Sequence, residues 1–199
     1  MEKKSEAKRN LILTRARQVF VRKGFANVTM KDIIEECGIS RGGLYLYFQS
    51  VDEIFMQVID THNQSKLKET KLHINDNFGD ASFHQLLDEY LERQKQRLLN
   101  LDNSLLVAMY EYRFANRDIF HKKFFHNQFI TTKNVVLDII NYGVEKGVVI
   151  CADAEALAAG VVLHIEGVSM LAVAAGVAPE FVDSQISFIR DVILRGGFQ

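Results

Sequence analysis

The stretch from residue 37 to residue 54 limits the fold most, because it reads as the end of one helix, a turn and the start of another. Gly38 can adopt the positive φ that ends a helix at little cost, and Ser40 can cap the next helix by accepting a backbone hydrogen bond. Gly42 and Gly43 fall in the first turn of that helix, where each costs about 1 kcal/mol relative to alanine. A helix that gives up stability in this way usually needs its backbone close to another molecule, and DNA phosphates or base edges are the expected partner.

Residues 29–48 read T-M-K-D-I-I-E-E-C-G-I-S-R-G-G-L-Y-L-Y-F, and this segment resembles the helix-turn-helix of the TetR family of bacterial transcriptional regulators. The family pattern is a threonine, a short helix with one apolar face, Gly-Val-Ser, a basic residue, a glycine, a small residue, an apolar residue, a tyrosine, a variable residue, a tyrosine or histidine, and a phenylalanine. The match has no gap and lies near the N-terminus, as in the family.

Three positions depart from the family pattern. Gly43 replaces the usual threonine, serine or alanine, and Leu46 stands where a polar or aromatic residue is common. Val51 stands where the family often has a lysine that contacts phosphate, so that contact is not expected here.

Helical periodicity continues along the rest of the chain, and its one proline, Pro179, favours long uninterrupted helices. We therefore expect an all-α protein. The resemblance implies an N-terminal three-helix helix-turn-helix DNA-binding head at 1–50 and a C-terminal helical bundle at 51–199 for effector binding and dimerisation, about nine helices in all. The first helix is predicted from Asn10 to Lys23, and a loop is predicted near residues 75–80.

The charges are unevenly distributed along the chain. Residues 1–50 hold ten Lys/Arg and five Asp/Glu, a formal charge of +5, whereas the remaining residues hold 14 and 20, a formal charge of −6. A basic head on an acidic body fits a protein that binds a polyanion with one end only. Two distant cysteines and no visible signal peptide lead us to expect a cytoplasmic protein without a disulfide framework.

The predicted partner of the head is double-stranded operator DNA. Leu44 and Phe48 form the inward face of the recognition helix, and the residues expected near phosphates or base edges are Thr29, Lys31, Arg41, Gly42, Gly43, Tyr45 and Tyr47. Thr29 is also an N-cap candidate, and both roles can coexist. Residues 1–9 are either a frayed terminus or a basic arm that contacts DNA, and the two interpretations remain open.

The segment 154–178 is the most apolar part of the chain and reads as a helix buried on nearly all sides. A membrane span is the competing interpretation, but His164 and Glu166 in mid-segment would cost several kcal/mol in lipid. We expect instead a homodimer held together by two C-terminal helices, at 154–176 and 179–195.

The resemblance also implies that the body binds an unknown small, largely apolar effector. A mostly apolar cavity with a few polar groups is the usual form of such a site. The candidate residues are Phe55, Ile59, His62, Tyr90, Met109, Tyr110, Phe114, Phe125, Phe129, His164, Glu166 and Met170. Each apolar member can equally be ordinary helical core, and His164 and Glu166 can equally pair across a dimer interface.

The sequence contains no enzyme signature: it lacks a phosphate-binding loop, a nucleophile elbow, a zinc-helix motif and the Rossmann glycine pattern. His121 and His126 are five residues apart on one helix and point to diverging faces, so no metal and no cofactor are expected. The expected function is a ligand-responsive regulator that represses transcription and leaves its operator when the effector binds. The alternative is a helical interaction protein or enzyme whose N-terminal helices only mimic a DNA-binding head. Sequence-specific DNA binding that weakens steeply with salt separates the two.

Overall fold

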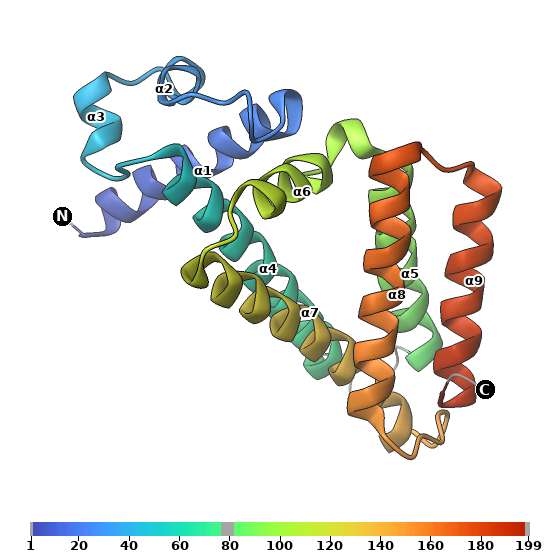
Figure 1. Cartoon of the computed structure of the whole chain (residues 1–199). Helices are drawn as coiled ribbons and strands as arrows, with labels where there is room; N and C mark the ends of the chain where they lie inside the picture. The colour runs from blue at the N-terminus through green and yellow to red at the C-terminus, as the bar shows by residue number, and fades with distance from the viewer. Residues whose placement is uncertain (1, 77–81, 198–199) are drawn as a thin grey trace. The chain divides into compact units, whose positions relative to one another are not determined.

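The computed structural model describes residues 2–76 and 82–197, and within these ranges the regular structure is helical throughout (Figure 1). The all-α prediction is confirmed. The helices are α1 (Glu2–Lys23), α2 (Met30–Cys37), α3 (Arg41–Tyr45), α4 (Val51–Asp76), α5 (Phe83–Leu99), a 3-10 turn (Leu101–Asn103), α6 (Leu106–Ala115), α7 (Ile119–Glu145), α8 (Ala154–Ala175) and α9 (Pro179–Arg195). The loop predicted near 75–80 lies largely outside the described residues, and α4 itself extends to Asp76.

The chain forms two compact units. The first contains residues 1–62 and 101–121, and the second contains residues 63–100 and 122–199. The first unit therefore includes the predicted head, residues 1–50, together with the beginning of α4, all of α6 and the beginning of α7.

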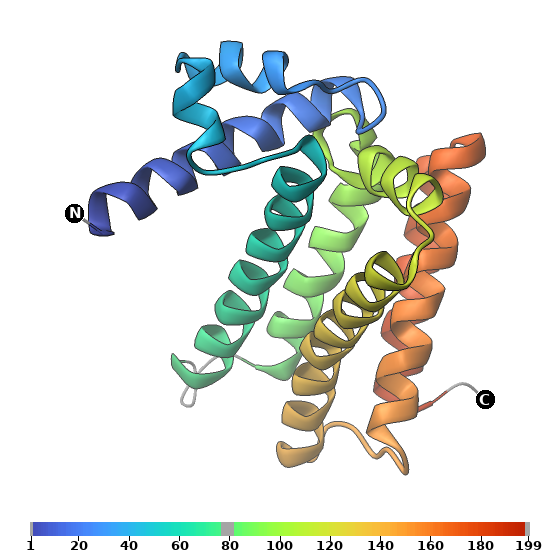
Figure 2. The same cartoon turned by 60° about the vertical axis from the view of Figure 1, so that its left-hand side comes forward.

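The first unit is built around α1, with α2 and α3 on one side of it (Figures 1 and 2). The apolar stripe of α1 is fully buried and consists of Ile12, Ala16, Val19 and Phe20. The helix begins at Glu2, earlier than the predicted Asn10. The additional residues are mostly charged residues with good helix propensity, which explains how the helix extends beyond its apolar stripe.

An aromatic cluster joins three helices of the first unit and the loop after α1. Phe55 on α4 lies at the centre, with its ring centroid 4.7 Å from that of Phe20, 5.0 Å from that of Phe25 and 4.9 Å from that of Tyr112. Phe25 and Tyr112 are themselves 4.6 Å apart in an edge-to-face arrangement. Contacts of this kind stabilise beyond the area that they bury, so the cluster holds α1 and α6 against the beginning of α4.

Local capping sets the bounds of α2 and α3 as predicted. The Thr29 hydroxyl accepts a hydrogen bond from the Asp32 backbone N–H at 3.3 Å, and the Asp32 carboxylate accepts one from the Thr29 N–H at 2.8 Å. Gly38 ends α2 with φ of 63°. Ser40 caps α3 by accepting a hydrogen bond from the Gly43 N–H at 3.1 Å.

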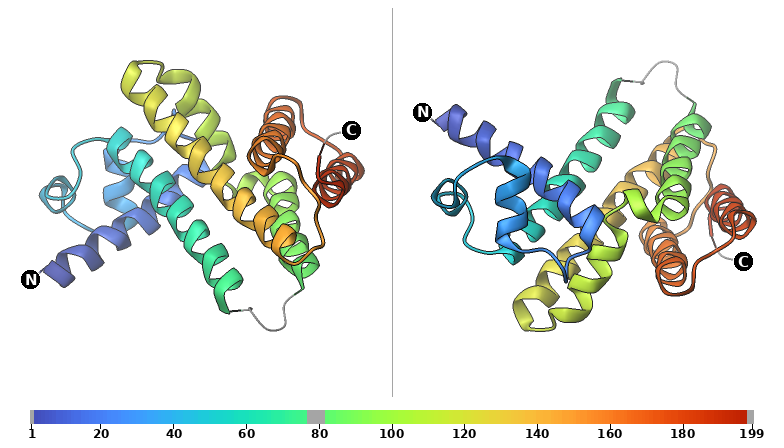
Figure 3. Two further views of the ribbon diagram at one scale, coloured as in Figure 1. Left: turned by 90° about the horizontal axis from the view of Figure 1, so that it is seen from below. Right: turned by 90° about the horizontal axis from the view of Figure 1, so that it is seen from above.

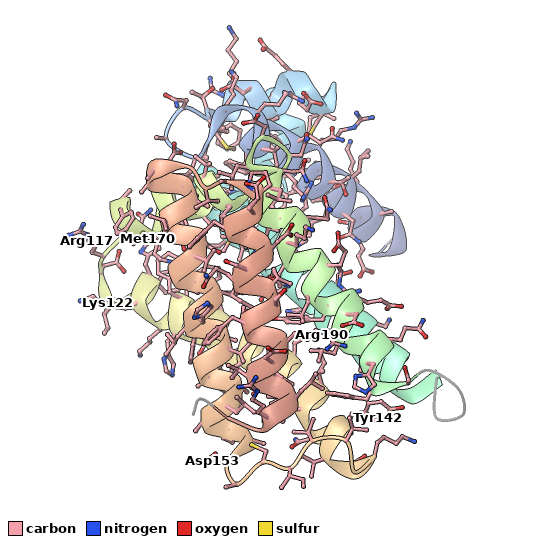
Figure 4. The ribbon with its side chains drawn as sticks, turned by 90° about the vertical axis from the view of Figure 1, so that its right-hand side faces the viewer. Arg117, Lys122, Tyr142, Asp153, Met170 and Arg190 are labelled. Carbon is pink, nitrogen blue, oxygen red and sulfur yellow. The ribbon has the colours of Figure 1, made fainter. Side chains whose placement is uncertain are left out.

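The second unit packs α5, α8 and α9 side by side, and Figure 3 views α8 and α9 nearly end-on. Its core is a single apolar cluster that includes Leu87, Ile139, Ile140, Val161 and Ile193. Ion pairs flank α9: Arg190 contacts Asp88 at 2.8 Å on the side that faces α5 (Figure 4), and Lys95 contacts Asp183 at 2.5 Å.

Among the described residues, only α8 is long and apolar enough by length and composition to cross a membrane. Its residues Leu157, Ala158, Val161, Val162 and Ile165 are buried in the core of the second unit. Leu163, Met170 and Leu171 on the same helix are exposed. The helix is therefore buried against its own unit on one side and open on another.

Candidate nucleic-acid interface

The helix α3, which is the expected recognition helix, has one buried and one open face. Leu44 and Phe48 are fully buried, as predicted, and they anchor the helix in the first unit. Arg41 is exposed, and its guanidinium lies 5.5 Å from the centroid of the half-buried Tyr45 ring. Cation–π contact at this distance orders an exposed arginine. The pair forms an open, positively charged and aromatic surface that can donate hydrogen bonds to phosphate or to base edges.

The two glycines of α3 differ in what surrounds them. At Gly43 an added Cβ would lie 3.2 Å from the Ser40 hydroxyl oxygen, which is the oxygen that caps the helix. At Gly42 no described atom lies within 4 Å of an added Cβ, apart from those of its chain neighbours and of its own helix backbone. Neither glycine has a positive φ. Packing within the chain therefore disfavours a side chain at Gly43 but not at Gly42.

Thr29 and Lys31 have local partners in the structure. The Thr29 hydroxyl donates a hydrogen bond to the Asp32 carboxylate at 2.7 Å in addition to its capping role. Lys31 is exposed and lies 3.7 Å from Glu35. A hydrogen bond from Lys23, and then those from Thr29, lower the pKa of Asp32 to about 2. Asp32 thus stays ionised at neutral pH and holds Thr29 in its capping position.

Arg9 is a residue that sequence reasoning missed. Its guanidinium donates a hydrogen bond to the Tyr47 carbonyl at 3.2 Å and two to the Gln57 side chain at 3.2 and 2.6 Å, and it lies 4.5 Å from the Phe48 ring centroid. Arg9 therefore connects α1 to the segment after α3 and to α4. Its spacing of three residues from Ile12 on the helix was the signal that could have revealed an inward orientation.

Glu111 on α6 supports the loop between α1 and α2. Its carboxylate accepts a hydrogen bond from the Ala26 N–H at 3.0 Å. An added Cβ at Gly24, which has φ of 72°, would lie 2.5 Å from the same carboxylate. This contact places α6 against the loop that precedes the helix-turn-helix.

A polar cluster surrounds His121 at the beginning of α7. Its Nδ1 lies 2.5 Å from Asp118, and its Nε2 lies 3.4 Å from Asp52 in the first turn of α4. Burial lowers the pKa of His121, but the hydrogen bonds to Asp118 and Asp52 together outweigh it, so the pKa is raised above its usual value. Burial, followed by the hydrogen bond to Asp52, raises the pKa of Tyr112. Sequence reasoning considered His121 only as a metal ligand and missed this cluster.

The candidate effector residues lie in both units and have different environments. In the first unit Phe55, Ile59 and Tyr110 are buried, Met109 is half-buried, and His62 and Phe114 are exposed. In the second unit Tyr90 is buried, Met170 is exposed, and Phe125, Phe129, His164 and Glu166 are half-buried.

Several of these candidates have defined contacts, among them Phe55 and His164. Phe55 belongs to the aromatic cluster, which gives it a packing role. His164 Nε2 lies 2.9 Å from the Gln185 side-chain oxygen, so it has a partner on α9 within its own chain.

Burial raises the pKa of Tyr90 to about 12. No group of three or more His, Cys, Asp and Glu able to hold a metal occurs within the described ranges.

Comparison with known proteins gives a consistent result. Residues 12–58 match the family model of bacterial regulatory proteins, tetR family. The chain is 37% identical over 101 residues to the HTH-type transcriptional regulator YfiR of Bacillus subtilis, covering 51% of this chain and 47% of that protein. It is 26% identical over 163 residues to YerO of the same organism, covering 79% of this chain and 54% of that protein. The alignments thus span about half the length of these relatives.

Solved structures share the fold at low sequence identity. A TetR transcription regulator from Haloarcula marismortui has a TM-score of 0.73 at 19% identity, covering 94% of this chain and 96% of that one. The reduced form of NemR from Escherichia coli has a TM-score of 0.71 at 13% identity, covering 96% and 99%. These likenesses extend the agreement in fold beyond the helix-turn-helix.

The family consists of transcription regulators and not enzymes, so the matches do not favour the alternative of an enzyme or a pure interaction protein. The matched residues 12–58 contain α2, α3 and the adjoining parts of α1 and α4. The helix-turn-helix of this chain is therefore similar to that of the TetR family of bacterial transcriptional regulators, and its all-helical fold is similar to that of solved TetR regulators.

Proposed function

We propose that the protein is a ligand-responsive transcriptional repressor that acts in the bacterial cytoplasm and binds double-stranded operator DNA through α2 and α3. The observation that carries the proposal is the open face of α3, where the side chains of Arg41 and Tyr45 lie together. On the opposite face, the buried Leu44 packs the helix against the first unit. The formal charge of +5 on residues 1–50 supports the same partner, since it attracts a polyanion. Thr29, Lys31, Gly42, Gly43 and Tyr47 complete the proposed DNA-binding set.

The test is DNA binding by the full-length protein. Duplexes bound by the protein are selected from a random-sequence pool, and their affinity is measured by fluorescence anisotropy at several salt concentrations. Arg41→Ala should weaken binding without changing the fold. If Arg41 contacts phosphate, the slope of log K against log salt drops by about 1, and if it reads a base, discrimination at one position relaxes by about 1–3 kcal/mol.

The matched control is Arg195→Ala, which removes the same charge from an exposed side chain in the second unit. It should leave the affinity and the specificity unchanged. Equal behaviour of Arg41→Ala and the wild type would remove Arg41 from the interface. Binding without sequence preference or salt dependence would count against the proposed function itself.

A homodimer is the proposed state of the regulator, and the exposed apolar face of α8 and α9 supports it. Leu163, Met170 and Leu171 on α8 and Phe181 and Phe188 on α9 are exposed in the chain alone (Figure 4 labels Met170). At Gly167, on the exposed side of α8, an added Cβ would have no described atom within 4 Å apart from those of its chain neighbours and of its own helix backbone. Small residues let a partner helix approach closely, and apolar faces of this kind mark protein interfaces.

The dimer is tested by charging this face. Phe188→Glu should give monomers in analytical ultracentrifugation and should weaken operator binding, because two recognition helices no longer act together. Ser187→Glu is the matched control, since Ser187 is exposed on the polar stripe of α9 that carries Asp183 and Arg190. Ile189 is unsuitable for this test, because its side chain is only 2% exposed and packs within its own unit. A dimeric Phe188→Glu variant would contradict the proposed interface.

Release by a small, largely apolar effector is the remaining part of the proposal. It is supported by the similarity to the TetR family and by polar side chains on the mainly apolar α8, among them His164 and Glu166. An effector releases DNA only if it binds the DNA-incompetent state more tightly, and linkage then requires operator DNA to weaken effector binding by the same factor. Compounds that raise the melting temperature of the protein are measured for affinity with and without operator. Equal affinities would mean that the compound is not an inducer.

A further inference from the structure

Leu46, directly after α3, is the most exposed large apolar side chain recorded for the first unit, at 82% exposure. A single exposed leucine is common on protein surfaces and by itself indicates nothing. Its location indicates a functional role, because Leu46 lies between the half-buried Tyr45 and Tyr47 and next to the face that carries Arg41.

Gly42 supplies an independent observation. A glycine in a helix costs about 1 kcal/mol relative to alanine. Neither a positive φ nor a close neighbour accounts for this glycine, since its added Cβ would meet open space. Gly38, by contrast, has φ of 63°, and Gly43 lies close to its capping serine. No contact within the described chain therefore explains why residue 42 is a glycine. The missing side chain indicates instead that another molecule approaches the helix backbone closely at this position.

Gly42 and Leu46 lie on the same face. The Leu46 N–H donates a hydrogen bond to the Gly42 carbonyl at 3.2 Å, so the two residues are one helical turn apart. The resulting surface is bare backbone followed by an isobutyl group, and its side chains carry no donor or acceptor. The Leu46 side chain therefore cannot pair with phosphate or with base nitrogen and oxygen atoms. In the major groove the one apolar group that distinguishes a base is the C5 methyl of thymine.

We propose that Leu46 reads the C5 methyl group of a thymine in each operator half-site, and that Gly42 lets α3 approach the bases closely enough for this contact. The inference rests on the proposed DNA-binding function and adds a specificity-determining residue to it. Arg41 and Tyr45 position the helix beside this contact, whereas Leu46 selects the base.

The experiment removes the methyl group alone. In the selected operator, each thymine is replaced in turn by 2′-deoxyuridine, which keeps the base pair and every hydrogen-bonding group. At one thymine per half-site the wild-type protein should bind about fourfold more weakly, the factor expected when a buried contact loses one CH₂-sized group. The Leu46→Ala protein should bind the thymine and deoxyuridine duplexes equally at that position. Ile119→Ala, which shortens another exposed apolar side chain of the first unit, should retain the full deoxyuridine effect.

Gly42→Ala adds a readout that misfolding cannot reproduce. This variant should melt at a higher temperature, because alanine favours the helix, while its operator affinity falls at least as far as that of Leu46→Ala. Deoxyuridine effects that are absent, or that persist unchanged in Leu46→Ala, would overturn the inference and leave the DNA-binding function intact. If no sequence-specific duplex is selected at all, the proposed function and this inference fail together.

Discussion

Replacing Phe55 by leucine separates a packing role from an effector-binding role for this residue. Phe55 was a sequence-based effector candidate, yet its side chain is fully buried among Phe20, Phe25 and Tyr112. Truncation of a buried phenylalanine to alanine typically costs about 3–5 kcal/mol. Leucine retains much of the apolar volume but loses three ring contacts worth roughly 0.5–1.5 kcal/mol each, which do not add fully. We expect Phe55→Leu to lower the free energy of unfolding by about 2 kcal/mol.

The assay is urea unfolding followed by far-UV circular dichroism, with near-UV circular dichroism as a second probe of the aromatic cluster. The matched control is Phe114→Leu, because Phe114 is 51% exposed and its centroid lies 6.3 Å from that of Tyr110 in the same unit. The control should change the free energy of unfolding by less than about 0.5 kcal/mol. A neutral effect of Phe55→Leu on stability, combined with loss of effector binding, would refute the packing role.

Three further predictions test single contacts. Asp32→Asn should destabilise the protein at pH 7. The difference should vanish as the pH falls through about 2, because the ionised Asp32 carboxylate stabilises the fold fully above the ordinary aspartate pKa and loses this effect as it is protonated. NMR titration should find the pKa of His121 raised, and Asp118→Asn should lower it; the stability from this raised pKa is present below the ordinary histidine pKa and is lost as the pH rises through the folded value. Gly196→Ala should destabilise the protein by more than about 1 kcal/mol, because φ is 76° and the new Cβ would overlap the Ile150 carbonyl. Unchanged unfolding midpoints or an unshifted histidine titration would contradict the respective contact.

The helix-turn-helix was predictable because its signals are local. Thr29, Gly38 and Ser40 act on backbone groups within a few residues, so the sequence alone predicts where α2 ends and α3 begins. Most of the proposed DNA-binding residues followed from the same stretch. Leu46 was noticed only as a departure from the family pattern, since exposure is not encoded in residue type.

Contacts between distant residues required the tertiary structure. Arg9 binds the carbonyl of Tyr47, and His121 lies beside Asp52, with 38 and 69 positions separating the partners. No pattern in the sequence indicates which of many surface charges meet across such separations. The effector candidates were uncertain for the same reason, because an aromatic residue at helical spacing suits a packed core and a ligand contact equally well.

Two neighbouring residues of α9 show most clearly what the sequence determines and what tertiary packing decides. Sequence periodicity marked an apolar face on this helix and thereby determined that it would be amphipathic. Phe188 and Ile189 are both apolar, but Ile189 is buried in the second unit whereas Phe188 is exposed. The choice depends on the rotation of α9 against α5 and α8, which is set by the packing of all three helices together. The sequence by itself therefore determined that the chain forms amphipathic helices with a helix-turn-helix head, and tertiary packing decided which apolar side chains remain available to a partner.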